Sequence, residues 1–506
     1  MSIVASPASD ARMGNGSGQY SLSPNFTEEE KEMIHSVGID FHRDQHRARC
    51  LDDRAQSCDS FSFQTTLEGL AKLEERVFRD GANPIIVFEP AGLAWLVVAV
   101  YLRSRHADCR LVKAKMQKIA ALRRYLRGSA KSDRIDALTL AKMPFIDPEQ
   151  LYEIYLPPAE IHALQRLTRQ RKRLEGDITG RKIRIGATTD GYLPGVRLAF
   201  TDPWSPQARA FLRSRLNPFA VVRDGEEALH AFLSKASLRG KGSRAESHLV
   251  FLACQSVAAL YELSRSVETI SEEFFTELQE EVARELRLME AEEAESESLA
   301  RRIAELYQKL HPSDNLRTIP GVGEHTAPVF LSAVGDPTRF RSQSAFANWE
   351  GIVPGARQSS NVEAKGLRMT KAGPAIMRMA LYQAGDIGRR WDPQLAAVYY
   401  REMVHHGKNH KQAMGAVMSH LGARVLAVLK EDRPYELRDP EGKLISKDEV
   451  RKFILSKYHV AEDIRRERRR HKPVKVRRKD REMTTYRTNE AAKAPQPVEV
   501  MAISRK

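Results

Sequence analysis

The first 150 residues alternate between short apolar runs and helical periodicity, and this pattern predicts a mixed α/β domain. Three short apolar runs separated by tight turns predict antiparallel strands. A later apolar run, Ile85–Phe88, predicts a strand buried on both faces. The predicted strands are 36–42, about 45–52, about 60–65, 85–88 and 110–114, and the predicted helices are 66–79, a helix opening at about 90, and 132–143, with a basic segment at 116–127. This order is that of a ribonuclease-H-like (RuvC-like) fold.

The chain then changes to long polar helices. Residues 157–185 predict a long basic helix, and about 255–310 predict an acid-rich one. Between them, 190–250 holds several Pro and Gly and is taken as an insertion of uncertain structure. Two long helices that flank an insertion could pair as an antiparallel coiled coil, or could dimerise.

The region from 313 predicts a mainly α-helical C-terminal domain with two candidate nucleic-acid contacts. Residues 316–335 contain Pro-Gly-Val-Gly between helical stretches and predict a helix-hairpin-helix. Backbone amides at Gly321 and Gly323 would then suit a phosphate. A polar loop follows at 351–361, with five cations nearby: Arg357, Lys365, Arg368, Lys371 and Arg378.

These patterns divide the chain into five segments. They are a disordered tail (1–32), the α/β domain (33–156), the long helices with their insertion (157–312), the C-terminal domain (313–435) and a basic, largely flexible tail (436–506).

Composition adds a partner class and a compartment. Lys and Arg number 81 against 66 Asp and Glu, a net charge of +15, which favours nucleic acid. The four cysteines form no CxxC pair, so neither zinc nor a disulfide framework is expected. The sequence shows no signal peptide and no apolar run long enough to span a bilayer. We therefore expect a cytoplasmic protein that does not bind a membrane.

Four carboxylates fall at special positions of the predicted α/β domain. Asp40 lies on the first strand, Glu89 ends the fourth, and Asp133 and Asp136 share one face of the last helix. Like charges on one face repel unless a cation lies between them, so we predict a site for Mg²⁺ or Mn²⁺. Two such ions can stabilise an in-line phosphoryl displacement. The alternative is that the acids pair with nearby arginines.

Two sets of motifs resemble a known family, the bacterial insertion-sequence DEDD transposases that include bridge-RNA-guided recombinases. The N-terminal set is Gly-Ile-Asp at 38–40, Phe-Glu-Pro at 88–90 and Lys-Ser-Asp-Arg-Ile-Asp-Ala at 131–137. The C-terminal set is Ile-Pro-Gly-Val-Gly at 319–323, Gly-Ile-Val-Pro at 351–354 with Gln-Ser at 358–359, and Met-Thr-Lys-Ala-Gly-Pro at 369–374.

The resemblance implies a mechanism and a set of partners. A serine of the C-terminal domain attacks a DNA phosphate and forms a covalent phosphoserine link, assisted by metals at Asp40, Glu89, Asp133 and Asp136. The matching serine is Ser359, but Ser360 stands where the family has Gly, so the register between the two stays open. The resemblance also implies double-stranded DNA, a guide RNA encoded by the element, and a dimer or tetramer in which the two domains of a site come from different protomers.

Two alternatives remain. A metal-dependent nuclease such as a junction resolvase would use the carboxylates while the serine is structural. A non-catalytic nucleic-acid-binding protein of this fold would need neither. The sequence contains neither a Gly-rich nucleotide-binding loop nor a Ser-His-Asp arrangement. An ATPase and a small-molecule hydrolase are therefore disfavoured.

Overall fold

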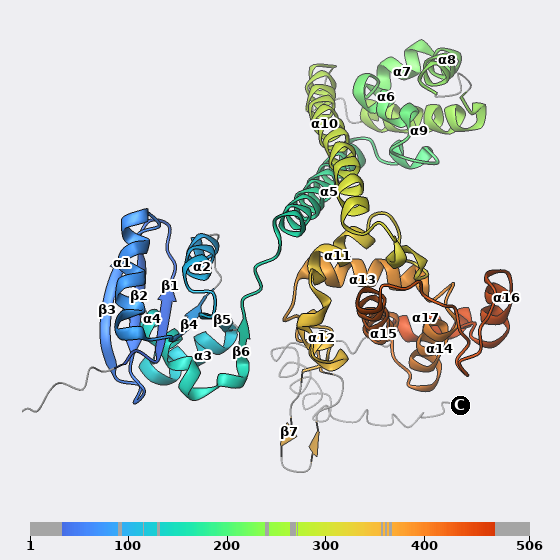
Figure 1. Cartoon of the computed structure of the whole chain (residues 1–506). Coiled ribbons are helices and arrows are strands. Elements are labelled where there is room, and N and C mark those ends of the chain that lie inside the picture. The colour runs from blue at the N-terminus through green and yellow to red at the C-terminus, as the bar shows by residue number, and fades with distance from the viewer. Residues whose placement is uncertain are drawn as a thin grey trace, which may run out of the picture. The chain divides into compact units, whose positions relative to one another are not determined.

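The structure is a computed structural model and consists of two compact units, Met1–Leu156 and Pro157–Lys506, each described by itself (Figure 1). It describes residues 33–89, 94–114, 116–128, 132–237, 242–263, 270, 272–355, 358–359, 362–363 and 367–470. The predicted disordered tail at 1–32 lies outside these residues. The first unit is a mixed α/β domain and the rest of the chain is mostly helical, so the predicted fold class is confirmed at this coarse level.

The first unit is built on a six-stranded sheet in the order β3-β2-β1-β4-β5-β6. β1 is antiparallel to β2 and parallel to β4, and β5 is parallel to β4. The strands are β1 (Ser36–Asp40), β2 (His46–Leu51), β3 (Ser57–Phe63), β4 (Ile85–Phe88), β5 (Arg110–Ala114) and β6 (Leu151–Glu153). The sequence reading missed β6, which pairs antiparallel with β5, and placed β3 about three residues late.

The strand residues alternate between two faces of this sheet, and helices cover both. On one face, Ile39 of β1 and Phe88 of β4 pack against apolar residues of two helices. These are α1 (Leu67–Val77) and α2 (Ala94–Arg105). On the other face, Val87 and Val112 pack with residues of α3 (Met116–Arg127) and α4 (Asp133–Ile146). The stretch at 116–127, read from the sequence only as basic, is therefore a helix of the domain.

Gly38 allows α4 to approach β1 closely. A Cβ atom at this position would lie 2.1 Å from the backbone oxygen of Ala137 and 2.3 Å from the backbone nitrogen of Ala141. Two strand positions earlier, the hydroxyl of Ser36 donates a hydrogen bond to the Ala141 carbonyl. Ser36, Gly38 and Asp40 point to the same face, so β1 presents Asp40 on the side that α4 covers.

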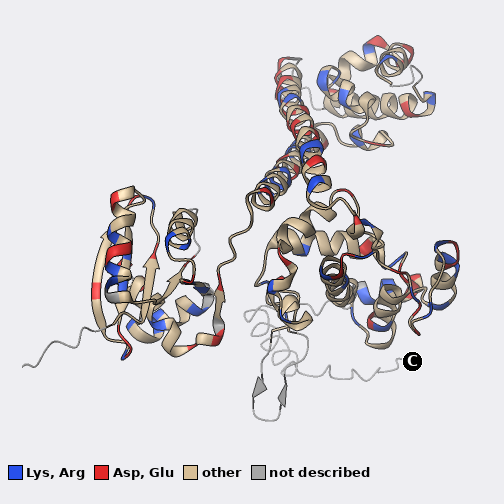
Figure 2. Cartoon of the chain, in the orientation of Figure 1, with Lys and Arg blue, Asp and Glu red and all other residues tan. Residues whose placement is uncertain are grey.

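The second unit begins with two long helices that pair with each other. α5 (Ala159–Tyr192) and α10 (Glu272–Leu310) run antiparallel, as the ion pairs between them establish. Arg181 contacts Glu292 at 2.8 Å, and near the other end Lys309 contacts Glu160 at 2.5 Å. Figure 2 shows basic and acidic residues along both helices.

The stretch between these helices, an insertion of uncertain structure in the sequence reading, is a small helical cluster. It contains α6 (Pro206–Ser214), α7 (Pro218–Asp224), α8 (Glu226–Ala236) and α9 (Arg244–Leu263). Its core includes Phe211, Val221 and Val250 and extends onto Phe275 of α10.

The remaining helices share one large core. They are α11 (Ala327–Val334), α12 (Gln343–Glu350), α13 (Ala375–Gly388), α14 (Pro393–Tyr400) and α15 (His410–Glu431), and Arg401–His405 forms a π-helix. Helix α15 is apolar and long enough to cross a membrane. However, Val417, Leu421 and Val425 are fully buried in the core, which is typical of a central helix in a globular domain.

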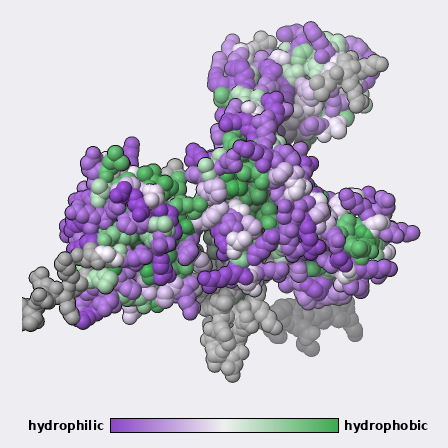
Figure 3. Space-filling model, viewed as in Figure 1, coloured by the Kyte–Doolittle hydropathy of each residue, from purple (hydrophilic) through white to green (hydrophobic). Residues whose placement is uncertain are grey.

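The tail that the sequence reading expected to be flexible folds through Arg470. α16 (Lys447–Lys457) and α17 (Glu462–Arg470) follow α15, and Val450 and Ile454 are buried against Ala396 of α14. The prediction of a largely flexible segment is therefore wrong for 447–470, and 471–506 lie outside the described residues. The face of the molecule in Figure 3 is mainly hydrophilic, with small apolar patches.

Candidate active site

Two neighbouring parallel strands bring Asp40 and Glu89 together. Ile39 of β1 is in register with Phe88 of β4, and each carboxylate is the next residue along its strand. In a parallel sheet, residues in register point to the same face. Asp40 and Glu89 therefore leave the sheet next to each other.

Helix α4 supplies the other two carboxylates from its first turn. Its N-cap is Ser132, whose hydroxyl accepts a hydrogen bond from the Ile135 amide. Asp133 and Asp136 then lie at the positive end of the helix dipole, which favours acidic side chains. Asp136 is buried and Asp133 is exposed.

His42, which the sequence reading did not assign, lies between Asp40 and Asp133. Its Nε2 atom is 3.1 Å from a carboxylate oxygen of Asp40 and 3.4 Å from one of Asp133. One donor atom from each of the three residues lies within 4.8 Å of the others, a spacing that could hold a metal ion. The sequence contained a signal for this, because residues 40 and 42 are two apart at the end of a strand and share a side of it.

The electrostatics of Asp40 reflect this crowding. The pKa of the Asp40 carboxyl is raised to about 6, mainly by burial and also by the negative charges of Asp136, Glu89 and Asp133, while His42 opposes the rise. The other three predicted carboxylates thus all act on Asp40. Without a cation, the ionised form of Asp40 is unfavourable here.

Arg123 of α3 partly neutralises the cluster. Its guanidinium donates a hydrogen bond of 2.8 Å to Asp136, and this bond, with the charges of Asp136, Glu89 and Asp40, raises the pKa of Arg123. The alternative reading of acids paired with arginines therefore holds for Asp136. Neither Asp40 nor Asp133 forms a salt bridge to an arginine among the described residues.

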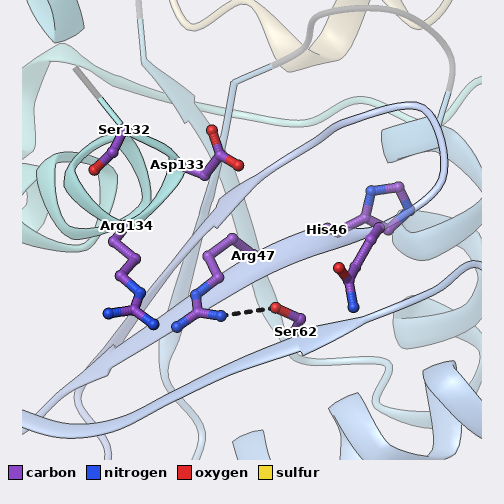
Figure 4. Close-up of a pocket in the computed structure, with 7 residues that line it drawn as sticks. His46, Arg47, Ser62, Ser132, Asp133 and Arg134 are labelled. Atoms are coloured by element: carbon purple, nitrogen blue, oxygen red, sulfur yellow. Dashed lines mark hydrogen bonds between the residues drawn. The ribbon is translucent and has the colours of Figure 1, made fainter.

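A cavity of about 340 Å³ opens beside Asp133 (Figure 4). Arg47 of β2 and Arg134 of α4 line it together with Ser62 of β3. Arg47 is in register opposite Asp40 and donates a hydrogen bond of 2.8 Å to the Ser62 hydroxyl. Two guanidinium groups next to the carboxylates suit a phosphodiester that must lie close to a metal centre.

The candidate serine lies in the second unit, in a short two-stranded element. β7 (Gln358–Ser359) pairs antiparallel with β8 (Val362–Glu363), with Ser359 opposite Val362. Ser360, Arg357 and Lys365 lie outside the described residues.

The predicted phosphate-binding glycines lie in a turn before α11. The segment that precedes them is a four-residue 3-10 helix, Asn315–Thr318, rather than the helix expected for a helix-hairpin-helix. The backbone N–H of Gly323 donates to the Thr326 hydroxyl at 3.0 Å, so this amide is not free as predicted. At Gly321 (φ +90°), a Cβ would lie 2.1 Å from the Ala384 carbonyl oxygen, so this glycine allows the turn to pack on α13.

The other predicted cations differ in exposure. Arg368 and Lys371 are exposed, and Lys371 has a left-handed backbone (φ +54°). Arg378 is half-buried, and its Nη1 atom donates to the backbone carbonyls of Gly373 and, at 3.3 Å, Glu350. It therefore fastens the loop before α13 to the end of α12.

Glu350, the last residue of α12, is fully buried and neither carboxylate oxygen has a hydrogen-bond partner among the described residues. It packs against Gly422 of α15, where a Cβ would lie 2.3 Å from its Oε1 atom. Burial raises the pKa of Glu350 to about 9, so the folded protein holds this carboxyl protonated at neutral pH.

This carboxyl predicts a pH-dependent stability. The folded state keeps the proton up to about pH 9, whereas the unfolded chain releases it near 4.5, so the free energy of unfolding falls as pH rises between these values. The slope is about 1.4 kcal/mol per pH unit. We expect Glu350→Gln to remove this slope and to raise stability at pH 8, as measured by denaturant unfolding of the second unit at pH 6 and pH 8.

The matched control is Glu305→Gln on α10, where the side chain is exposed. It should leave both the stability and its pH dependence unchanged. A Glu350→Gln protein that is less stable than wild type at pH 8 would contradict a buried, protonated Glu350.

Comparison with known proteins assigns both halves of this arrangement to one group. A family model described as "Transposase", for the DEDD transposases of IS110 elements, matches 37–194. A second, described as "Transposase IS116/IS110/IS902 family", matches 313–400. Both regions of the chain are therefore similar to the IS110 family of DEDD transposases. The first match contains all four carboxylates, and the second contains the candidate serine.

Individual relatives also come from insertion elements or invert genes, by their printed names. The "Insertion element IS110 uncharacterized 43.6 kDa protein" of Streptomyces coelicolor is 25% identical over 370 residues, which are 72% of this chain and 85% of the relative. Pilin gene-inverting proteins of Moraxella bovis and Moraxella lacunata are each 30% identical, over 128 and 123 residues. These alignments cover only 40% and 38% of the two pilin gene-inverting proteins.

Proposed function

We propose that this protein is a DNA transposase that cuts and rejoins DNA at the ends of an insertion element. The observation that carries the proposal is the gathering of Asp40, His42 and Asp133 within 4.8 Å, with Asp136 and Glu89 acting on the same carboxyl. The printed names of the relatives, an insertion-element protein and two gene-inverting proteins, support DNA rearrangement as the outcome.

The carboxylates fit a divalent ion. They offer oxygen ligands, which Mg²⁺ and Mn²⁺ prefer, and the pKa of Asp40 is raised by burial and by the three neighbouring carboxylates, so a cation would favour its ionised form. Asp40, Glu89, Asp133 and Asp136 would hold the metal, and His42 lies where it could add a nitrogen ligand. When bound, the metal would stabilise charge on the entering and leaving oxygens of a phosphoryl transfer. The strand order β3-β2-β1-β4-β5 supports assigning this domain to the ribonuclease-H-like class.

The chain's own residues would then carry out two transfers. The hydroxyl oxygen of Ser359, or of Ser360, forms a bond to a DNA phosphorus while the bond from that phosphorus to a deoxyribose oxygen breaks, and the released hydroxyl takes a proton. A hydroxyl of the partner DNA end then attacks the phosphoserine and frees the serine. Arg47 and Arg134 line a cavity in which they would hold the phosphodiester beside Asp133. We further propose that the serine and the carboxylates come from different protomers of a dimer or tetramer.

We also propose that an RNA encoded by the element selects the DNA sites by base pairing. The experiment combines purified protein, a donor plasmid that carries the element, a target plasmid, Mg²⁺ and RNA transcribed from the element's non-coding flank. Joined donor–target DNA is expected only when the RNA is present. Joining that proceeds equally without RNA would contradict the guide.

A second candidate function is a metal-dependent DNA nuclease. It is favoured by the fact that all four carboxylates and His42 lie within the first unit, so this centre needs no residue of the second. In the same assay, nicked or linear DNA without joined product would support the nuclease.

A further inference from the structure

A second cavity, of about 320 Å³, lies among the C-terminal helices of the second unit. Trp391 follows α13, Tyr399 belongs to α14, Arg451 to α16 and Arg465 to α17, and all four line it. Its volume is near the lower end of the range for small-molecule sites. The side of the cavity that α16 and α17 form lies outside the family-model matches, because the second match ends at residue 400.

The lining is cationic. Four arginines and one histidine line the cavity, and no acidic residue does. Arg389 and Arg390 are paired with Asp386, at 2.6 and 2.8 Å. In the part of the chain that the structure describes, neither Arg451 nor Arg465 is in an ion pair, and the Nε atom of Arg465 is buried without a hydrogen-bond partner. A buried donor without an acceptor can donate a hydrogen bond to an anionic ligand.

Aromatic rings stand beside these cations. Trp391 is 43% exposed, which is unusual for so large an apolar side chain, and the guanidinium of Arg451 lies 5.6 Å from the centre of its ring. Tyr399 faces the guanidinium of Arg389 at 4.3 Å. An exposed indole next to unpaired guanidinium groups is the combination that binds single-stranded nucleic acid, since the ring stacks on a base and the cations bind the phosphate.

We propose that this cavity binds one unpaired nucleotide of a single-stranded RNA or DNA, with the base on Trp391 and the phosphate at Arg451 and Arg465. The inference rests on the proposed function only in taking nucleic acid as the partner. A free inorganic anion would not need the indole. A duplex would not offer an unstacked base to a cavity of this size.

The test uses the full-length protein in EDTA and fluorescein-labelled tetranucleotides, uridine RNA and thymidine DNA, followed by fluorescence anisotropy. The short probes limit binding to one nucleotide-sized site and its edges. Trp391→Ala and Arg451→Gln are each expected to weaken binding roughly tenfold. Trp391→Phe keeps an aromatic face and should remain within about threefold of wild type.

The matched control is Lys452→Gln, which removes the same charge from the neighbouring, exposed position of α16. It should change the affinity less than twofold. Tighter binding of the RNA probe would identify RNA as the source of the nucleotide, and equal binding would indicate any single strand. Equal losses in Arg451→Gln and Lys452→Gln, or no loss in Trp391→Ala, would overturn the proposal.

Because the assay contains no divalent ion and no reaction, its outcome is independent of the carboxylate centre. Failure here together with intact DNA joining would remove only the cavity inference. Normal probe binding in a protein that joins no DNA would leave the cavity and remove the proposed function.

Discussion

Asp40→Asn is expected to reduce DNA joining by at least about 1,000-fold while leaving the fold intact. Asp40 contacts His42, and the charges of Glu89, Asp133 and Asp136 all act on it, so we expect it to be the central ligand of the metal. Loss of a metal's charge stabilisation removes several kcal/mol from the transition state, and each 1.36 kcal/mol is a factor of ten. The measurement is the rate of joined product at saturating Mg²⁺.

Two further measurements separate this effect from misfolding. The substitution removes a like charge from a crowded site, so the metal-free protein should be no less stable than wild type. Mn²⁺ or Mg²⁺ at 100 times its dissociation constant should stabilise the wild-type protein by about 2.7 kcal/mol, and should stabilise Asp40→Asn little. The control Asp53→Asn, at an exposed position in the β2–β3 turn, should behave as wild type in all three assays. Activity within tenfold of wild type in Asp40→Asn would contradict the metal site.

Gly38→Ala is expected to destabilise the first unit by about 3 kcal/mol or more. The added methyl would lie 2.1 and 2.3 Å from backbone atoms of α4, which cannot rotate away as a side chain could, so the helix must move. Because α4 carries Asp133 and Asp136, the same substitution should also abolish DNA joining. The measurement is thermal unfolding together with hydrogen exchange of Asp133–Ile146, which should lose protection.

The matched control for this prediction is Gly176→Ala, within α5, where a Cβ would meet nothing within 4 Å. Alanine at an open helical position should stabilise slightly, by up to about 1 kcal/mol. Wild-type protection of α4 in Gly38→Ala would show that the close approach of α4 to β1 is not required.

Much of the first unit could be predicted from the sequence because its elements have strong local signals. β1 and β4 are apolar runs, and α4 begins at a serine that caps it. Strand β6 could not be predicted, because it is a three-residue edge strand fixed only by its pairing with β5. α16 and α17 are so rich in charge that they read as a flexible tail, and only the spacing of Val450 and Ile454 indicated a buried face.

The candidate site could be predicted as a set of carboxylates but not as a geometry. The topology of parallel neighbours was enough to bring Asp40 and Glu89 to one edge. The contact of His42 with Asp133 and the pairing of Arg123 with Asp136 depend on how α3 and α4 pack, which no local pattern encodes. The helix-hairpin-helix prediction took the stretch before Pro-Gly-Val-Gly as a helix, whereas it is a short 3-10 helix, and Gly321 makes a close packing contact with α13.

The most direct test of the central claim is a search for a covalent protein–DNA adduct. Wild-type protein, Ser359→Ala and Ser360→Ala are each incubated with labelled donor DNA, the element's RNA and Mg²⁺, and the products are separated on a denaturing gel. The account predicts a labelled adduct in wild type that one of the two variants lacks, which would identify the nucleophile. DNA cleaved without an adduct, and equally in both variants, would contradict the phosphoserine transposase and leave a metal-dependent nuclease.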